Sequence, residues 1–281
     1  MEVVDFAQEI IQGKRIEDKL YALDEPRLRF SFDKAAPLEK VIVPNREKKI
    51  ALSQKQIKFP RGHFHIPEKK AIALNSFANH ELLAIEIMAK MLVEFPHETK
   101  EEKLFKKGII SSLKDEQKHL HLYVERLNEL GYELGDFPLN DYFWRQSINI
   151  TSRAEYLSIM SVTFEGANLD FAALYRDLFL EVEDKKTADI LETVLKDEIS
   201  HVAFGMHWLS QWKKEKSVWQ YYLENLPSPL TPARARGKSF NEVDRLKAKM
   251  DKSFISELLS FDDNFNVTKR KEWKEAKESN L

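Results

Sequence analysis

The sequence predicts an all-α protein built on a four-helix bundle with a long middle crossover. Three observations support this fold class. The motif Asp-Glu-x-x-His occurs at residues 115–119 and again at 197–201, each time inside a long stretch of helical periodicity. The expected turns within each pair of helices are short, whereas residues 132–151 form a long link between the pairs. Such a link can traverse a bundle from end to end, which an up-down-up-down bundle would not need.

Apolar periodicity and helix-end signals place the four bundle helices. The first is expected from residue 68 to 94. The second begins at a capping box headed by Thr99 and ends at Gly131, because glycine favours the conformation that terminates helices. The third begins at a second capping box, headed by Ser152. The fourth follows a turn near Asp184, so the chain resembles two successive helical hairpins.

The chain divides by composition into three segments. Residues 1–69 are punctuated by proline and glycine and are expected to form an arm that packs on the bundle. Residues 70–213 form the four-helix bundle with the predicted metal site. Residues 214–281 form a helical extension, with one helix expected from 241 to 259 and a charged tail from 268.

Composition excludes several function classes. The chain has 281 residues, no cysteine and a formal net charge of −2. Disulfides, iron–sulfur clusters and thiolate ligands are therefore excluded, and a metal must be bound by nitrogen and oxygen. No global basic excess indicates a dedicated nucleic-acid binder. No apolar stretch is long enough for a membrane span and the first residues do not form a signal peptide, so we expect no membrane partner and a cytoplasmic location.

The repeated motif has the chemistry of a di-metal site. A glutamate and a histidine three residues apart share one helix face, so each copy offers a carboxylate and an imidazole to one metal. A lone inward glutamate precedes each copy at a similar interval, 116 − 81 = 35 and 198 − 165 = 33 residues. Burying these carboxylates without a cation would be costly. The candidate ligands are Glu81, Glu116, His119, Glu165, Glu198 and His201.

This order of ligands resembles that of the ferritin-like di-iron carboxylate proteins over about residues 70–213. The segments 79–86, 135–138 and 197–203 are most similar to a bacterial ferritin-like family of unknown function. The resemblance implies a ferritin-like bundle with two iron ions. It also implies that Glu116 and Glu198 bridge the metals, that the other two glutamates are terminal ligands, and that each histidine binds one metal. Oxygen-rich ligands suit iron, and manganese or a mixed manganese–iron pair would use the same set.

The aspartate before each motif glutamate is expected to support a ligand. Metal-bound histidines usually donate their second ring proton to a carboxylate. We therefore expect Asp115 to orient His201 and Asp197 to orient His119.

Other residues carry alternative interpretations. Glu86 is an alternative to Glu81, although it breaks the symmetry of the spacing. His63 and His65 form either a lid or second metal site, or a solvated pair in a polar loop. Gly205, one turn after the second motif, either opens space beside the metals or permits close helix packing.

The expected activity is oxidation or hydroxylation of a small organic substrate with O₂ or peroxide, which also requires an electron donor. The alternatives are a ferroxidase, which would assemble into an oligomeric shell, and a metal-free helical interaction module. A tRNA substrate is weakly indicated by one basic cluster, formed by Arg234, Arg236, Lys238, Arg245, Lys247 and Lys249.

Overall fold

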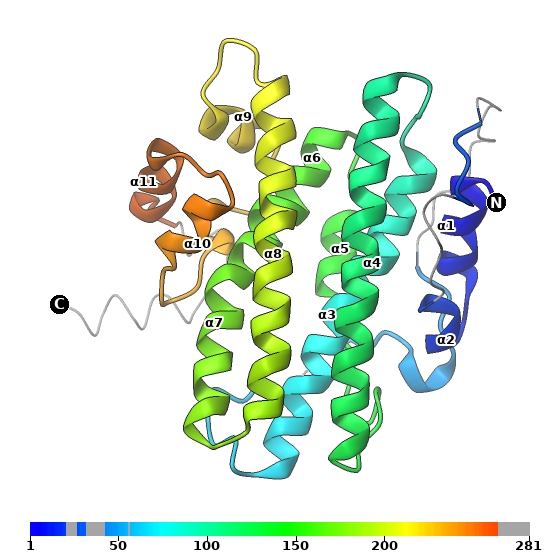
Figure 1. Ribbon diagram of the computed structural model, residues 1–281, viewed down its shortest axis with the longest axis vertical. Coiled ribbons are helices and arrows are strands. Elements are labelled where there is room, and N and C mark those ends of the chain that lie inside the picture. Colours follow the sequence, from blue (N-terminus) through cyan, green and yellow to red (C-terminus); the bar gives the residue numbers. More distant parts are fainter. Residues whose placement is uncertain (21–26, 32–42, 56, 264–281) are drawn as a thin grey trace. The chain divides into compact units, whose positions relative to one another are not determined.

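The computed structural model describes residues 1–20, 27–31, 43–55 and 57–263 (Figure 1). In these residues the regular secondary structure is helical, and no extended strand forms. Two isolated β-bridges are present among them, between Glu2 and Arg29 and between Leu52 and Leu139. The predicted all-α class is therefore confirmed.

The N-terminal arm packs on the first bundle helix. Helix α1 (Val3–Gln12) is amphipathic and buries Phe6 and Ile10 completely on the side that contacts α3. Helix α2 (Ile16–Lys19) follows, and a short 3-10 turn, η2 (Lys48–Ile50), precedes α3. The predicted arm is thus partly helical, and its apolar face is covered by α3.

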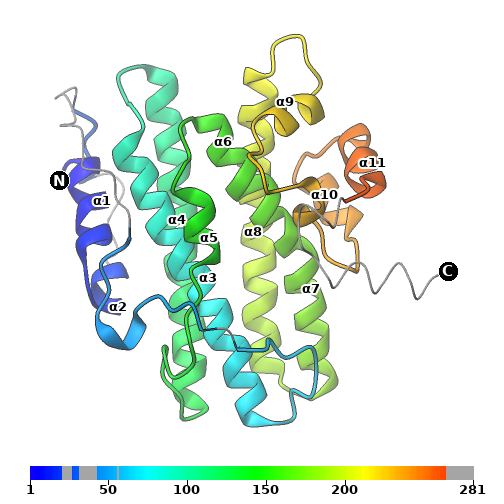
Figure 2. The ribbon, with the colours of Figure 1, turned by 180° about the vertical axis from the view of Figure 1, so that it is seen from behind.

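Helices α3 (Pro67–Glu94) and α4 (Lys100–Glu129) form the first antiparallel hairpin, and they lie side by side in Figures 1 and 2. The predicted capping box is present, because Thr99 Oγ1 accepts a hydrogen bond from the Glu102 amide at 3.1 Å. The helix ends where the glycine signal placed it, with Gly131 at a φ of +80°. Both end signals of this helix are confirmed.

The long link after α4 follows α3. Asn79 Nδ2 donates to the Asn140 carbonyl at 2.9 Å, and Asn75 Nδ2 donates to the Phe137 carbonyl at 3.3 Å. A short helix, α5 (Tyr142–Ser147), also contacts α3. Side-chain amides of one helix therefore hold a segment that the sequence predicted only as a crossover.

The third bundle helix is continuous but not regular. It consists of α6 (Arg153–Leu157), a π-helical segment η3 (Ser158–Phe164) and α7 (Glu165–Glu181). Ser152 caps its start as predicted, since its Oγ accepts from the Glu155 amide at 3.1 Å. The sequence predicted one uniform α-helix here, and the π segment is a departure from that prediction.

The fourth bundle helix, α8 (Lys185–Trp212), begins after a turn at Asp184, as predicted. The buried Asp184 carboxylate accepts hydrogen bonds from Lys70 Nζ at 2.7 Å and from Arg126 Nη2 at 3.0 Å. Arg126 Nε also donates to Thr187 Oγ1 at 3.0 Å. This turn is therefore held by one cation from α3 and one from α4.

The C-terminal extension, which we define as residues 214–263, contains α9 (Val218–Glu224), η4 (Pro232–Ala235), α10 (Glu242–Lys247) and α11 (Lys252–Ser260). The prediction of a single helix from 241 to 259 was wrong. Lys249 takes a left-handed φ of +64°, and Asp251 then caps a new helix by accepting from the Phe254 amide at 2.7 Å. The predicted charged tail from residue 268 lies outside the described residues.

By internal contacts the chain forms two compact units. The first comprises residues 1–150 and 177–190, and the second comprises residues 151–176 and 191–281. Helices α7 and α8 each have one end in the first unit and continue into the second. The predicted segment boundaries at residues 69 and 213 stay predictions. None of the described helices has the length and apolar composition that a membrane span requires.

Candidate metal centre

Three predicted ligands of the first unit lie together on α3 and α4. Glu81, Glu116 and His119 are buried, and each offers one ligand atom within 4.8 Å of the others. Glu116 Oε2 lies 3.7 Å from His119 Nδ1. We call these three residues the first half-site. His80, the residue before Glu81, stacks on Phe143, and burial lowers the pKa of His80 to about 4, which keeps this imidazole neutral.

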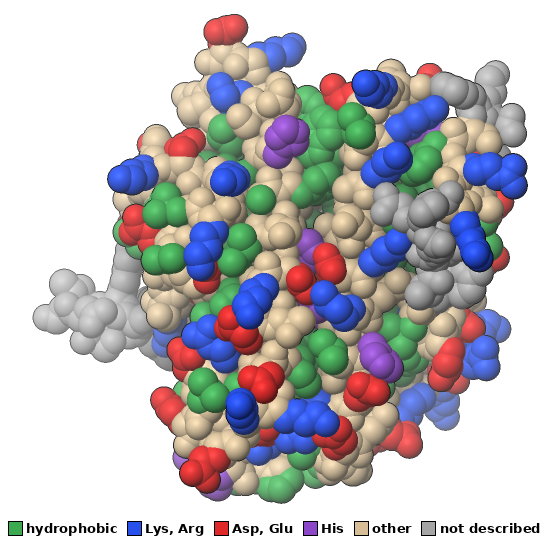
Figure 3. All heavy atoms as spheres, in the orientation of Figure 1, with side chains coloured by type: hydrophobic (Ala, Val, Ile, Leu, Met, Phe, Trp, Pro, Cys, Tyr) green, Lys and Arg blue, Asp and Glu red, His purple; other side chains and the backbone are tan. Residues whose placement is uncertain are grey.

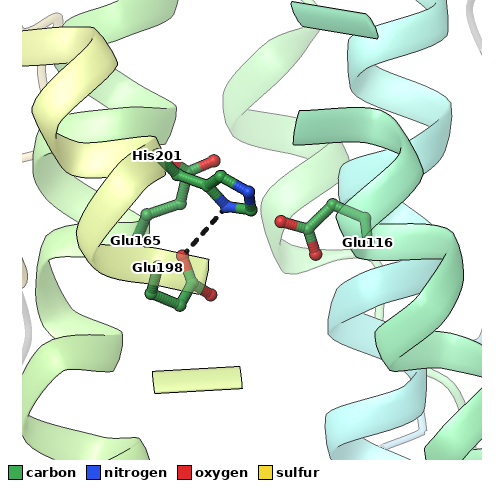
Figure 4. A group of neighbouring side chains, drawn as sticks. All are labelled: Glu116, Glu165, Glu198 and His201. Atoms are coloured by element: carbon green, nitrogen blue, oxygen red, sulfur yellow. Dashed lines mark ion pairs between the residues drawn. The ribbon is translucent and has the colours of Figure 1, made fainter. Parts of the chain in front are cut away.

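The other three predicted ligands lie together in the second unit. Glu165 at the start of α7 and the pair Glu198 and His201 on α8 are buried, with ligand atoms within 4.8 Å of one another (Figure 4). Glu198 Oε2 lies 3.4 Å from His201 Nδ1, the contact that is dashed in Figure 4. We call these residues the second half-site. Its internal arrangement matches that of the first, as the duplicated motif predicted.

The donor atoms fit a metal ion. Nitrogen and carboxylate oxygen bind metals such as zinc at about 2.0–2.2 Å, so two donors of one ion lie at most ~4.3 Å apart. The Glu-to-His separations of 3.7 and 3.4 Å fall within this limit. Each half-site also buries two carboxylates, which is costly unless positive charge or protons compensate. A cation bound between these donors would offset that cost.

A supporting residue that the sequence did not identify is Asn168. Its Nδ2 donates a hydrogen bond to Glu198 Oε1 at 2.8 Å. Asn168 follows Glu165 by three residues, and the corresponding residue after Glu81 is Ala84. In the sequence, the signal for this role of Asn168 was a polar residue one helical turn after the candidate ligand Glu165. The two half-sites therefore have the same types of ligand residue, but they differ in the residue that supports the motif glutamate.

The π segment η3 ends at the residue before Glu165. Thr163 Oγ1 donates to the Ser158 carbonyl at 2.6 Å, across the five-residue spacing of this segment. π-helical turns often occur at functional sites. Because one extra residue in a helix rotates all later side chains by about 100°, this segment determines the direction in which Glu165 points.

The two predicted supporting aspartates are partly exposed on the ligand helices. Asp115 lies on α4 with Oδ1 3.2 Å from Lys118 Nζ, and Asp197 lies on α8. Their expected pairing with His201 and His119 stays a prediction.

Glu86 is not an alternative ligand to Glu81. Its carboxylate lies 3.0 Å from Lys19 Nζ and 2.7 Å from Arg46 Nη2, and all three side chains are buried. Two cations from the N-terminal arm therefore neutralise it. Glu86 joins the arm to α3.

For the remaining candidate residues, the structure favours the interpretations that give them no role at the metal centre. His63 and His65 are exposed, with ring centroids 5.8 Å apart, and belong to neither group of described residues that could hold a metal. A Cβ atom on Gly205 would lie only 2.5 Å from Ser161 Cβ, so this glycine permits close packing of α8 against η3. Close packing, rather than an open channel, explains Gly205.

Several side chains of the basic cluster suggested for tRNA binding are engaged in contacts within the protein. Arg245 is fully buried, and Arg236 Nη2 donates to the Phe261 carbonyl at 2.8 Å. Lys247 Nζ lies 2.7 Å from Asp244 Oδ1. On the face drawn in Figure 3, positive and negative side chains are interspersed. These contacts remove the main support for a tRNA surface.

Comparisons with known proteins place the chain in a family without adding a function. The profile of a family described as "Protein of unknown function (DUF455)" matches residues 6–256. A protein of Haemophilus influenzae (strain ATCC 51907 / DSM 11121 / KW20 / Rd), named "Uncharacterized protein", is 26% identical over 177 residues. The match covers 61% of this chain and 61% of that protein. No solved structure gives a significant match.

Proposed function

The chain belongs to the DUF455 family, and we propose that in this protein the two half-sites join into one ferritin-like di-iron carboxylate centre that uses O₂ to oxidise an organic substrate. One observation carries the proposal. Two buried sets of Glu, Glu and His repeat the same internal geometry, with Glu-to-His distances of 3.7 and 3.4 Å. A site for two metals needs such a pair of sets.

Helix register supports the joining of the half-sites. Lys70, Arg126 and Thr187 lie at one level, where they surround Asp184. From that level, Glu81 is 11 residues away on α3 (81 − 70) and Glu116 is 10 residues away on α4 (126 − 116). At 1.5 Å per residue, both ligands lie about 15–17 Å from the Asp184 turn.

The same count applies to α8. Glu198 is 11 residues beyond Thr187 (198 − 187), and α8 is continuous between them. A straight helical segment of 11 residues is about 17 Å long, which equals the separation of Glu81 from Lys70 along α3. Equal counts along the ligand helices are what the proposed single centre requires.

The ligand set favours iron. Four carboxylates balance the charge of two divalent ions, and two imidazoles complete a donor set that iron and manganese both accept. When bound, reduced iron supplies electrons to O₂. Manganese or a manganese–iron pair remains the alternative loading.

The protein residues hold and orient this centre. Glu81, Glu116, Glu165 and Glu198 would hold the two ions, with the bridging and terminal roles that the ferritin-like resemblance implies. The hydrogen bond from Asn168 orients Glu198 through Oε1, and Glu198 Oε2 lies beside His201. Neutral His119 and His201 would each offer Nδ1, the nitrogen that faces the neighbouring carboxylate.

The overall reaction requires a reductant. Insertion of one oxygen atom into a C–H bond consumes O₂, two electrons and two protons, and it releases one water molecule. The electrons come from an external donor, such as a reductase or a reduced small molecule. The substrate is a small organic molecule, whose identity this proposal leaves to experiment.

Metal content tests the centre. Protein purified without chelator should contain two iron ions, or two iron and manganese ions in total, per chain by mass spectrometry. The double variant Glu116→Ala and Glu198→Ala should contain none. A matched control replaces Glu125 and Glu192, glutamates of the same two helices that form exposed or half-exposed ion pairs, and should keep both metals. Two metals in the ligand variant would refute the site.

Oxygen consumption tests the activity. Anaerobic protein loaded with ferrous iron should consume O₂ and develop ferric absorbance in stopped-flow mixing, and uptake should stop at two irons per chain. Continued iron uptake in an oligomeric shell would instead support the ferroxidase alternative. Purification without metal, and no binding of added iron or manganese, would support the interaction module.

A further inference from the structure

The C-terminal extension contacts the third bundle helix on both sides of Glu165. Tyr222 of α9 contacts Thr163, two residues before this ligand. Arg245 of α10 contacts Gly166 and Asp170, one and five residues after it. All these residues lie within the second unit.

The contact before Glu165 stabilises the π segment. Thr163 Oγ1 lies 2.8 Å from the Tyr222 hydroxyl and 2.6 Å from the Ser158 carbonyl oxygen. A hydroxyl has a single proton to donate, so Thr163 donates to Ser158 and Tyr222 donates to Thr163. Burial raises the pKa of Tyr222, which keeps its phenol protonated as a donor. The phenol therefore supports the Thr163 hydroxyl that bonds back within η3.

The contact after Glu165 fixes the first turns of α7. The Arg245 guanidinium binds Asp170 through two parallel hydrogen bonds, from Nη1 to Oδ1 at 2.6 Å and from Nη2 to Oδ2 at 2.8 Å. Arg245 Nη2 also donates to the Gly166 carbonyl at 3.1 Å. Both charged side chains are buried, and the guanidinium lies 3.9 Å from the centroid of the Phe240 ring. Such a bidentate pair defines orientation as well as distance.

The charge of Asp170 is satisfied by the extension alone. Besides Arg245, its carboxylate accepts hydrogen bonds from the Gly237 amide at 2.7 Å and the Asn241 amide at 2.6 Å. Ordinary packing of an added helix on a bundle would not require so many hydrogen bonds to one carboxylate. The extension thus holds α7 by several directed bonds close to a ligand.

We propose that the C-terminal extension positions the metal ligand Glu165, with Tyr222 preserving the π segment before it and Arg245 fixing the helix after it. This inference rests on the proposed metal centre. It assigns a specific task to residues outside the bundle. Metal binding by the second half-site then depends on Tyr222 and Arg245, whereas binding by the first half-site does not.

The experiment uses two parent variants, each of which keeps only one half-site complete. Glu81→Ala leaves the second half-site as the complete set, and Glu165→Ala leaves the first. Into each background and into the wild type we would place Tyr222→Phe, which removes only the hydroxyl, and Arg245→Gln. Lys216→Gln is the control, because Lys216 also belongs to the C-terminal extension and forms an exposed ion pair with Glu224.

Binding would be measured by titration with Co²⁺, whose visible absorbance reports the coordination of the ion, and helix content would be checked by circular dichroism. In the Glu81→Ala background, Tyr222→Phe and Arg245→Gln should each weaken binding by roughly ten- to a hundredfold and change the spectrum. In the Glu165→Ala background they should have no effect. Lys216→Gln should leave binding unchanged in both backgrounds.

The outcomes distinguish this inference from the function on which it rests. A wild type that binds two ions, with variants of unchanged affinity and spectrum, would overturn only the positioning role. Equal weakening in both backgrounds would also overturn it, because the effect would then be general. If Arg245→Gln does not fold, Tyr222→Phe decides alone. A wild type that binds no metal overturns both proposals.

Discussion

Asn168 Nδ2 donates a hydrogen bond to Glu198 Oε1 at 2.8 Å, and the matching position of the first half-site, Ala84, has no side-chain donor. The two halves of the proposed centre are therefore chemically unequal. The orientation of Glu198 is fixed by a neighbouring amide, an arrangement that the position of Ala84 cannot supply to Glu116.

Asn168→Ala should lower the metal affinity of the second half-site by roughly ten- to a hundredfold, the usual cost of losing a bond to a ligand. Titration with Co²⁺ in the Glu81→Ala background would measure this change. Asn225→Ala is the control, because Asn225 Nδ2 donates only to the Tyr221 carbonyl, at 2.8 Å. Equal affinities of the Asn168→Ala variant and its parent would exclude the role.

Asp115→Ala and Asp197→Ala should each weaken metal binding by roughly ten- to a hundredfold, since the histidine that each supports would lose its orienting carboxylate. Each variant should mainly affect the half-site that contains its histidine, His201 for Asp115 and His119 for Asp197. Metal titration in the two single-half-site backgrounds would resolve this. An effect of Asp115→Ala confined to the first half-site would contradict the crossed pairing.

Glu86→Ala should destabilise the fold without removing metal. The change leaves Lys19 and Arg46 buried without their shared carboxylate, which typically costs about 3–5 kcal/mol. Urea unfolding would measure the loss, and metal analysis would show whether both ions remain. Glu224→Ala, which breaks an exposed pair with Lys216, should cost at most about 1 kcal/mol. Loss of one metal in Glu86→Ala would return Glu86 to the list of ligands.

Lys106 should make the stability of the protein rise with pH in the alkaline range. Burial lowers the pKa of its ammonium to about 8, from an ordinary value of 10.5, while nearby Glu102 partly opposes this shift. Between these two values the unfolded chain binds more protons than the folded chain, so stability increases with pH. The increase should be about 1 kcal/mol per pH unit.

The comparison of wild type with Lys106→Met isolates this effect in the alkaline range, because the variant lacks the titrating ammonium. The free energy of unfolding of the wild type, relative to the variant, should rise from pH 8 to pH 10.5. In the folded protein Lys106 Nζ lies 2.6 Å from the Leu92 carbonyl and 2.9 Å from His97 Nδ1. A difference that is flat across the range would show that Lys106 titrates normally.

The sequence was sufficient for features encoded by neighbouring residues. The capping box headed by Thr99, the N-cap at Ser152 and the glycine stop at Gly131 depend on contacts within a few positions, and all three are present. The capping box predicted at Ser152 was wrong in one respect, because the Glu155 carboxylate accepts from the Thr151 amide and not from the Ser152 amide. The closeness of Glu116 to His119 and of Glu198 to His201 was predictable for a similar reason. A glutamate and a histidine three residues apart must share a helix face, wherever that helix is placed.

Features that depend on distant residues were not predictable. The π segment contacts Tyr222, which follows Thr163 by 59 positions, and no local sequence pattern predicts this contact. From the sequence Glu86 was a possible metal ligand, because its hydrogen-bond partner Arg46 lies 40 positions away. The break between α10 and α11 falls at Lys249, a residue type that rarely takes a positive φ, so neither glycine nor proline marked it.

The buried Asp184 carboxylate sets an order for events during synthesis of the chain. Lys70 is synthesised 114 residues before Asp184, and Arg126 is synthesised 58 residues before it. Until Asp184 emerges, two cations at the base of the first hairpin repel each other and stay hydrated, because the anion that allows their burial is missing. Contacts over such separations also form slowly. Burial of Lys70 and Arg126 at the base of this hairpin therefore waits until residue 184 has been synthesised.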